Sequence, residues 1–133
     1  MQGRGPATIL VAEDEPDLLA LVRDTLLADG HDVMTAADGV EALEVFEQGG
    51  IDLLLTDLVM PELGGARLAQ LVKELDPGVA VLFMTGYPSR GQYAAADLPS
   101  DATILYKPLD LPALKAAVAG ALARRRERVA EPG

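Results

Sequence analysis

One short apolar run constrains the fold of this chain more than any other stretch. Residues 51–57 read Ile-Asp-Leu-Leu-Leu-Thr-Asp, with Gly49-Gly50 before them and Pro61 after them. A buried helix would need about ten residues or more, so this run predicts a strand that is buried on both faces. In open parallel α/β sheets, ligands bind in the crevice beyond the carboxyl ends of such strands. Asp57, which ends the run, is therefore the first candidate functional residue.

Short apolar strands alternate with helical patterns along the chain. The expected strands are residues 8–12, 31–36, 51–57, 79–84 and 103–106. A helical pattern follows each strand, and the one within residues 88–99 is the weakest because Gly91 interrupts it. The loop 62–65, which contains two glycines, gives the backbone freedom to turn beside Asp57. Five strands that alternate with five helices predict an α/β fold with helices on both faces of a parallel sheet.

Polar residues lie at the carboxyl ends of four of these strands. They are Glu13-Asp14, Asp57, Thr85 and Lys107. All strands point the same way in such a sheet, so these residues should meet at one edge, where neighbouring strands lie about 4.8 Å apart and a lysine can reach across. Three carboxylates close together repel one another unless a cation is present, and Mg2+ favours carboxylate, water and phosphate oxygens. The sequence therefore predicts a magnesium pocket that also holds one hydroxyl and one ammonium group.

The predicted pocket suits phosphoryl transfer to a carboxylate. Asp57 can attack phosphorus and form an aspartyl phosphate, while a bound cation, Lys107 and Thr85 neutralise or hydrogen-bond the phosphoryl oxygens. Simpler interpretations exist, because Asp57 alone could cap a helix, and Glu13 and Asp14 could be solvated loop acids. The presence of all these residues at the ends of strands favours the phosphoacceptor and metal-binding interpretations.

Composition and charge argue against several other classes of function. The chain has no cysteine, which excludes disulfides, thiolate metal sites and a cysteine nucleophile. A net charge of -10 argues against nonspecific nucleic-acid binding, so the arginines within residues 124–128 are interpreted as a solvated helix end. His31 follows a glycine at the start of a strand and is expected to be a surface or edge residue, not a phosphohistidine. No apolar run is long enough to span a membrane, and we expect a cytoplasmic protein without a membrane partner.

The expected domain organisation is simple. Residues 1–7 form a flexible N-terminal tail, residues 8–124 form one domain, and residues 125–133 form the end of the last helix and a C-terminal tail. No internal repeat or linker divides the chain, and its length fits a single hydrophobic core.

Four groups of residues occur in a characteristic order along the chain. They are Glu13-Asp14, Asp57 with Met60-Pro61 and Gly65, Thr85-Gly86, and Lys107-Pro108. Together they resemble the receiver domain of two-component response regulators, over about residues 7–124. The resemblance implies a flavodoxin-like (CheY-like) doubly wound fold, with five parallel strands in the order 2-1-3-4-5 and helices on both faces. The end of the fourth strand also resembles that of stand-alone receivers and of receivers attached to hybrid kinases.

The same resemblance assigns roles in the predicted pocket. It implies that Asp57 accepts a phosphoryl group from a histidine kinase or a phosphotransfer protein. It further implies that Mg2+, or alternatively Mn2+, is ligated by Asp14, Asp57 and the backbone carbonyl of Val59, and by Glu13 through water. Such a chain is a phosphoacceptor signalling domain and not an enzyme, although it takes part in its own phosphorylation and dephosphorylation.

Thr85 and Lys107 would bind the phosphoryl oxygens of a receiver, and the Lys107-Pro108 bond would be cis. The chain departs from the family three residues before the lysine, where many receivers carry an aromatic residue that changes orientation and this chain has Ile104. An aromatic residue, Tyr106, instead lies directly before Lys107. The usual aromatic switch is therefore not expected here.

The predicted function is that of a single-domain response regulator, whose phosphorylation changes a surface that binds a downstream protein. The expected output face comprises Tyr93, Ile104, Tyr106 and the final helix. A receiver detached from a hybrid histidine kinase would look the same. The enzyme alternative is a magnesium-dependent phosphatase with Asp57 as nucleophile, but the two residues after Asp57 supply no proton donor. The sequence has no glycine-rich phosphate loop after the first strand and no segment for a DNA-binding domain, so no nucleic-acid partner is expected.

Overall fold

The computed structural model describes residues 7–86, 98 and 102–130 of the chain. The elements in this part are β1 (Thr8–Ala12), α1 (Pro16–Ala28), β2 (Asp32–Ala36), α2 (Gly39–Glu47), β3 (Leu53–Asp57), α3 (Gly65–Leu75), β4 (Ala80–Thr85), β5 (Ile104–Tyr106) and α4 (Leu111–Ala130). All five expected strands and four of the expected helices are therefore present among the described residues. The remaining helix, expected within residues 88–99, lies outside them except for Leu98.

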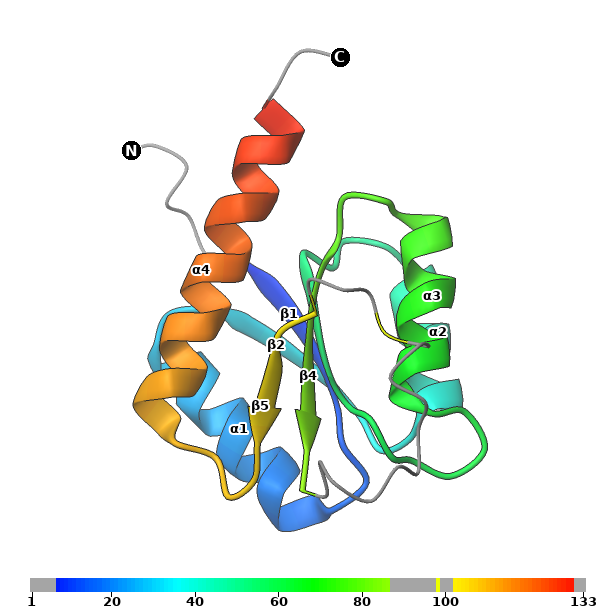
Figure 1. Cartoon of the computed structure of the whole chain (residues 1–133), viewed down its shortest axis with the longest axis vertical. Coiled ribbons are helices and arrows are strands. Elements are labelled where there is room, and N and C mark those ends of the chain that lie inside the picture. Colours follow the sequence, from blue (N-terminus) through cyan, green and yellow to red (C-terminus); the bar gives the residue numbers. More distant parts are fainter. Residues whose placement is uncertain (1–6, 87–97, 99–101, 131–133) are drawn as a thin grey trace.

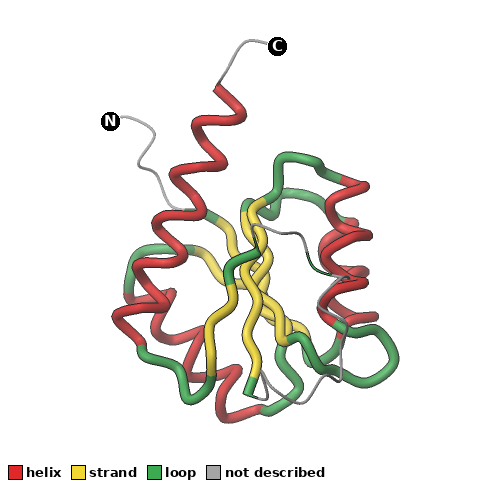
Figure 2. Tube along the Cα trace, in the orientation of Figure 1, coloured by secondary structure: helices red, strands yellow, loops and turns green. Residues whose placement is uncertain are grey.

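The strands form one parallel sheet in the order β2-β1-β3-β4-β5. This order confirms the predicted α/β class and its flavodoxin-like, CheY-like topology. Figure 1 shows α1 and α4 on one face of the sheet and α2 and α3 on the other. In Figure 2 the strands, drawn in yellow, lie between these two layers of helices. The chain thus has the layered arrangement in which the carboxyl ends of the strands share one edge.

β3 lies at the centre of the sheet and is buried along its whole length, as its apolar run predicts. Leu53 and Leu55 pack into a core with residues of α1 and α4, while Leu54 packs into a second core with residues of α2 and α3. Successive side chains of a strand point to opposite faces, so one run of leucines fills both cores. Packing on both faces fixes the position of Asp57 at the end of the strand.

Capping residues set the helix boundaries. At the start of α2, Asp38 accepts a hydrogen bond of 2.8 Å from the Glu41 N–H. Glu15 caps α1 in the same way, by accepting a hydrogen bond of 2.6 Å from the Leu18 N–H. Gly30 follows the end of α1 with a φ of 95°, a left-handed conformation that glycine adopts without strain. Both helices therefore begin just beyond the carboxyl ends of the strands that precede them.

The start of α3 lies in close contact with the end of β3. A Cβ atom on Gly65 would collide with the backbone carbonyl oxygen of Asp57, and the Gly65 N–H donates a hydrogen bond of 2.9 Å to the carbonyl of Leu58. The chain turns in this loop as expected, but neither Gly64 nor Gly65 has a positive φ. The positive φ of this loop, 68°, occurs at Glu62. Glycine is needed at position 65 for close backbone approach.

α4 has one buried face and then extends past the sheet (Figure 1). Its buried residues are Leu114, Val118, Ala121 and Leu122. Arg124 is exposed, as expected of a solvated helix end. Arg125 differs from that expectation, because its side chain is only 21% exposed and its Nη1 lies 3.6 Å from Oδ1 of Asp52. In the described part of the chain, no helix is both long and apolar enough to cross a lipid bilayer.

Gly65→Ala tests the close contact between α3 and β3. The added methyl group would meet the Asp57 backbone, so we expect the free energy of unfolding to fall by about 1–3 kcal/mol. Gly120→Ala, in α4, is the matched control, because its nearest neighbour would be the mobile end of the Arg124 side chain at 3.5 Å. This substitution should raise the same quantity by about 0.5–1 kcal/mol. Urea denaturation measures both, and a Gly65→Ala variant as stable as the unchanged chain would contradict the prediction.

Candidate functional site

The carboxyl edge of the sheet brings the predicted polar residues together. Glu13 follows β1, Asp57 ends β3, Thr85 ends β4 and Lys107 follows β5. Glu13, Asp57 and Thr85 are almost fully buried, with exposed fractions of 1%, 5% and 0%. His31 is not part of this group, because it precedes β2 at the opposite edge, where its Nδ1 accepts a hydrogen bond of 3.5 Å from the backbone of residue 7. The edge therefore holds a buried polar cluster.

Lys107 joins two of the acids. Its Nζ donates a hydrogen bond of 2.8 Å to Oδ2 of Asp57 and one of 3.0 Å to Oε1 of Glu13. The other oxygen of Glu13, Oε2, accepts a hydrogen bond of 2.9 Å from the Glu15 N–H. The backbone N–H of Lys107 also donates a hydrogen bond of 2.9 Å to the carbonyl of Thr85, which connects the lysine to the end of β4. The lysine thus reaches from the edge strand across β4 to the carboxylates of β3 and β1.

A pocket of about 550 Å³ opens at this cluster. It is lined by all six residues that the sequence predicts for the site, namely Glu13, Asp14, Asp57, Val59, Thr85 and Lys107. Its size lies within the range of about 300–1,000 Å³ that is common for ligand pockets. The pocket has room for a small anion beside the carboxylates.

The acids of the pocket lie close enough together to hold a divalent metal ion. One carboxylate oxygen from each of Glu13, Asp14 and Asp57 lies within 4.8 Å of the others. Hard cations such as Mg2+ take oxygen ligands, and the donor set here consists of oxygens only. Both oxygens of Glu13 already accept hydrogen bonds, whereas Asp14 is exposed at the pocket and Val59 lines it. This arrangement suits direct ligation by Asp14 and Asp57 better than by Glu13.

The cluster shifts two pKa values. Burial raises the pKa of Glu13 to about 7; the charge of Asp57 adds to this rise, and the hydrogen bond from Lys107 opposes it. Burial alone would lower the pKa of Lys107, but hydrogen bonds to Asp57 and Glu13 outweigh this effect and raise it. Lys107 is therefore cationic at neutral pH, and it is the positive charge around which the acids are arranged.

Three further residues line the pocket without having been assigned to the site from the sequence: Glu15, Gly86 and Pro108. Glu15 belongs to the run of acids after β1, and its backbone N–H orients Glu13. A Cβ atom on Gly86 would lie 3.7 Å from Cδ of Lys107, so the lysine stem passes beside the bare glycine. The Lys107-Pro108 bond is cis, as the family resemblance implies. The sequence signal for Gly86 and Pro108 was their place in the motif groups Thr85-Gly86 and Lys107-Pro108, and for Glu15 it was adjacency to Glu13-Asp14.

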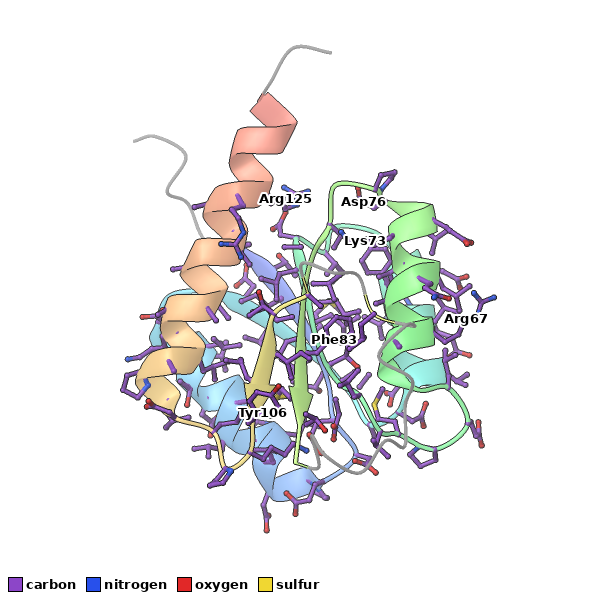
Figure 3. All side chains as sticks on the ribbon, in the orientation of Figure 1. Arg67, Lys73, Asp76, Phe83, Tyr106 and Arg125 are labelled. Carbon is purple, nitrogen blue, oxygen red and sulfur yellow. The ribbon has the colours of Figure 1, made fainter. Side chains whose placement is uncertain are left out.

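The predicted output face lies only partly among the described residues, because Tyr93 is outside them. Ile104 is partly buried and packs in a small cluster with Phe83, its partner in the β4–β5 register. Tyr106, the register partner of Thr85, is 53% exposed. Figure 3 shows Phe83 on the α3 side of β4 and Tyr106 on β5 near the carboxyl edge. Tyr106 thus directly precedes the pocket residue Lys107 in the sequence, whereas Ile104 lies three residues before it.

Lys107→Ala would leave Glu13 and Asp57 buried without their shared cation. We expect the free energy of unfolding to fall by about 1–3 kcal/mol without divalent metal, less than for a fully buried pair because Lys107 is 24% exposed. Lys115→Ala, at an exposed position of α4, is the control and should change this quantity by less than about 0.5 kcal/mol. Denaturation in the presence of a chelator measures both. Equal losses for the two variants would show that the cluster gives Lys107 no special role in stability.

Comparisons with known proteins agree with this geometry. A family model described as the response regulator receiver domain matches residues 9–119. The response regulator receiver protein CpdR of Brucella abortus is 37% identical over 103 residues, which are 77% of this chain and 86% of CpdR. The transcriptional regulatory protein GlrR of Escherichia coli is 35% identical over 117 residues, which are 88% of this chain and 26% of GlrR. This chain thus spans about a quarter of the length of GlrR.

A solved structure extends the likeness to the fold. The response regulator protein TrrA of Thermotoga maritima, crystallised in complex with Mg2+-BeF, is 27% identical with a TM-score of 0.75. The alignment covers 86% of this chain and 98% of that one. The family match covers most of the chain, and strand order and pocket agree with it. The chain therefore belongs to the response regulator receiver domain family of two-component systems.

Proposed function

We propose that this chain is a single-domain response regulator in which Asp57 accepts a phosphoryl group from the phosphohistidine of a histidine kinase or a phosphotransfer protein. The observation that carries the proposal is the position of Asp57 in the pocket. Its carboxylate lies 2.8 Å from the Lys107 ammonium and within 4.8 Å of oxygens from two other acids. The single-domain assignment is supported by the match to most of CpdR. The matches to part of GlrR and to part of the sensor kinase CckA of Brucella abortus favour the alternative of a receiver within a longer protein, such as a hybrid kinase.

The proposed reaction is an in-line displacement at phosphorus. A carboxylate oxygen of Asp57 forms the new O–P bond, the P–N bond to the donor histidine breaks, and the electron pair of that bond returns to the imidazole, which takes up a proton. The Lys107 ammonium, already beside Asp57, would move onto a phosphoryl oxygen, and the Thr85 hydroxyl would donate to another. Catalysis would consist of positioning and charge neutralisation.

The proposed cofactor is Mg2+, held by Asp14, Asp57 and the backbone carbonyl of Val59, with Glu13 acting through water. When bound, the ion supplies charge neutralisation for the phosphoryl oxygens. Mn2+ also accepts oxygen ligands and is proposed as a substitute. The same pocket would support loss of the phosphoryl group to water. The proposed location is the cytoplasm, where kinases have access to ATP.

The proposed output is a change in a protein-binding surface. Phosphorylation adds about 1.5–2 negative charges at Asp57, which would draw Thr85 and Lys107 toward the pocket. These two residues are joined by a backbone hydrogen bond of 2.9 Å, so their movement would shift the ends of β4 and β5 together. The surface formed by Ile104, Tyr106 and α4 borders these ends and is the proposed binding face for a downstream protein.

Asp57→Asn tests the phosphoacceptor assignment. Incubation with acetyl phosphate and Mg2+ should label the unchanged chain and leave the variant unlabelled, because the amide cannot act as the nucleophile. Asp24→Asn removes an exposed carboxylate of α1 and is the matched control, which should be labelled like the unchanged chain. Intact-mass spectrometry detects the adduct. Labelling of the Asp57→Asn variant would exclude Asp57 as the acceptor.

Asp14→Asn tests the metal site separately. At a Mg2+ concentration of about a hundred times the dissociation constant, the free energy of unfolding of the unchanged chain should rise by about 2.7 kcal/mol. The variant should need at least about tenfold more Mg2+ for the same rise in melting temperature, because it loses a charged ligand. Asp17→Asn, an exposed position in the first turn of α1, should behave like the unchanged chain. An unaltered Mg2+ titration of Asp14→Asn would show that Asp14 is not a ligand.

A further inference from the structure

Glu62 occupies a strained position in the loop between β3 and α3. Among the described residues, it is the one non-glycine residue with a positive φ, 68°. The Leu63 N–H donates a hydrogen bond of 2.7 Å to the carbonyl of Pro61, which closes a three-residue γ-turn centred on Glu62. A γ-turn with positive φ is rare and strained for a residue that has a Cβ atom.

The described part of the chain offers no internal reason for a glutamate at this position. The Glu62 side chain is exposed and forms no hydrogen bond or ion pair with any described residue. At the other described positions with positive φ the chain has glycine, namely Gly30, Gly49 and Gly50. The glutamate therefore strains the backbone without making a compensating contact within this part of the molecule. Such conflicts between local conformation and residue type are typical of functional positions.

The loop is held in place around the strained residue. Met60 is buried, and Gly65 packs against the Asp57 backbone. Figure 1 shows the loop projecting at the edge of the sheet where the strands end. Val59, three residues before Glu62, lines the Asp57 pocket and is 40% exposed. The carboxylate of Glu62 is thus presented to solvent on the loop that borders the phosphoacceptor.

The charges around the pocket complete the argument. Asp14 and Glu15 are exposed at its rim, and the cation that lines it, Lys107, is already bound to two acids. A protein that brings a phosphohistidine to Asp57 must cover this acidic edge of the sheet. Electrostatic complementarity favours a donor protein with basic side chains at this edge.

We infer that Glu62 is a specificity-determining residue of the phosphotransfer interface, where its carboxylate pairs with a lysine or arginine of the phosphodonor protein. The inference rests on the proposed function, because it presumes that a protein delivers the phosphoryl group. A charge at the rim of an interface acts mainly on the association rate, and salt screens its effect. A small donor such as acetyl phosphate makes no such interface, so its reaction should not depend on Glu62.

The test compares protein and small-molecule donors on three variants. Glu62→Gln removes the charge, Glu62→Gly also relieves the turn, and Glu62→Asp keeps the charge. The control is Glu47→Gln, an exposed carboxylate at the end of α2, on the opposite edge of the sheet. The protein donor is the autophosphorylated histidine kinase of the source organism that transfers fastest to the unchanged chain in a pairwise screen.

At low ionic strength, kcat/KM for transfer from this kinase should fall roughly fivefold in Glu62→Gln and Glu62→Gly and stay near normal in Glu62→Asp and Glu47→Gln. The difference should largely vanish at about 1 M salt. Labelling by acetyl phosphate should be the same for every variant. Glu62→Gly should also melt about 3 °C higher than the unchanged chain, because glycine relieves the turn.

Each contrary result has a distinct meaning. Equal transfer from the kinase to Glu62→Gln and to the unchanged chain would overturn the inference and leave the proposed function intact. A lower melting temperature for Glu62→Gly would overturn the strain argument on which the inference is built. Failure of the unchanged chain to accept phosphate from acetyl phosphate and from every kinase would instead contradict the proposed function.

Discussion

The site depends on one shared cation. The Lys107 ammonium contacts Asp57 at 2.8 Å and Glu13 at 3.0 Å, and both acids are almost fully buried. Removing carboxylates from water is unfavourable, and an unpaired buried charge is far more costly than a paired one. The pairing is possible because parallel strands deliver residues from β1, β3 and β5 to the same edge. The ion pairs of the pocket can therefore form only in a sheet whose strand order brings these three strand ends together.

Packing keeps the acids of this cluster in place. Leu53, Leu54 and Leu55 anchor β3 in the cores on both faces of the sheet, so Asp57 lies at the end of a fully buried strand. Gly65 lets α3 start directly against the Asp57 backbone. The backbone at Asp57 is thus tightly packed and has little room to move when a charge is added to the side chain. If Asp57 is phosphorylated as proposed, the added charge would act first on Lys107, which contacts Asp57 and follows the edge strand β5.

Local sequence signals predict the elements and the pocket better than the contacts that join distant segments. The apolar runs locate the strands, and the polar residues at their ends locate the pocket, because side-chain alternation and strand direction are general properties. Periodicity alone indicates an α/β class, whereas the strand order needs the family resemblance. The ion pair of Arg125 with Asp52 depends on where α4 passes the sheet, which no local pattern encodes. The positive φ of Glu62 is likewise unexpected, since nearby glycines are better suited to that angle.

β5 is the least protected strand of the sheet. It has three residues, none of them fully buried, whereas all five residues of β3 are buried. Short, half-exposed elements open locally at lower free energy than the core, and amide hydrogen exchange detects such opening. Lys107 therefore follows a strand, β5, that is expected to open locally at a lower free energy than β3, which carries Asp57. Local opening of β5 would separate Lys107 from Asp57 and Glu13, and its closing would restore the contacts, while the rest of the described structure stays folded.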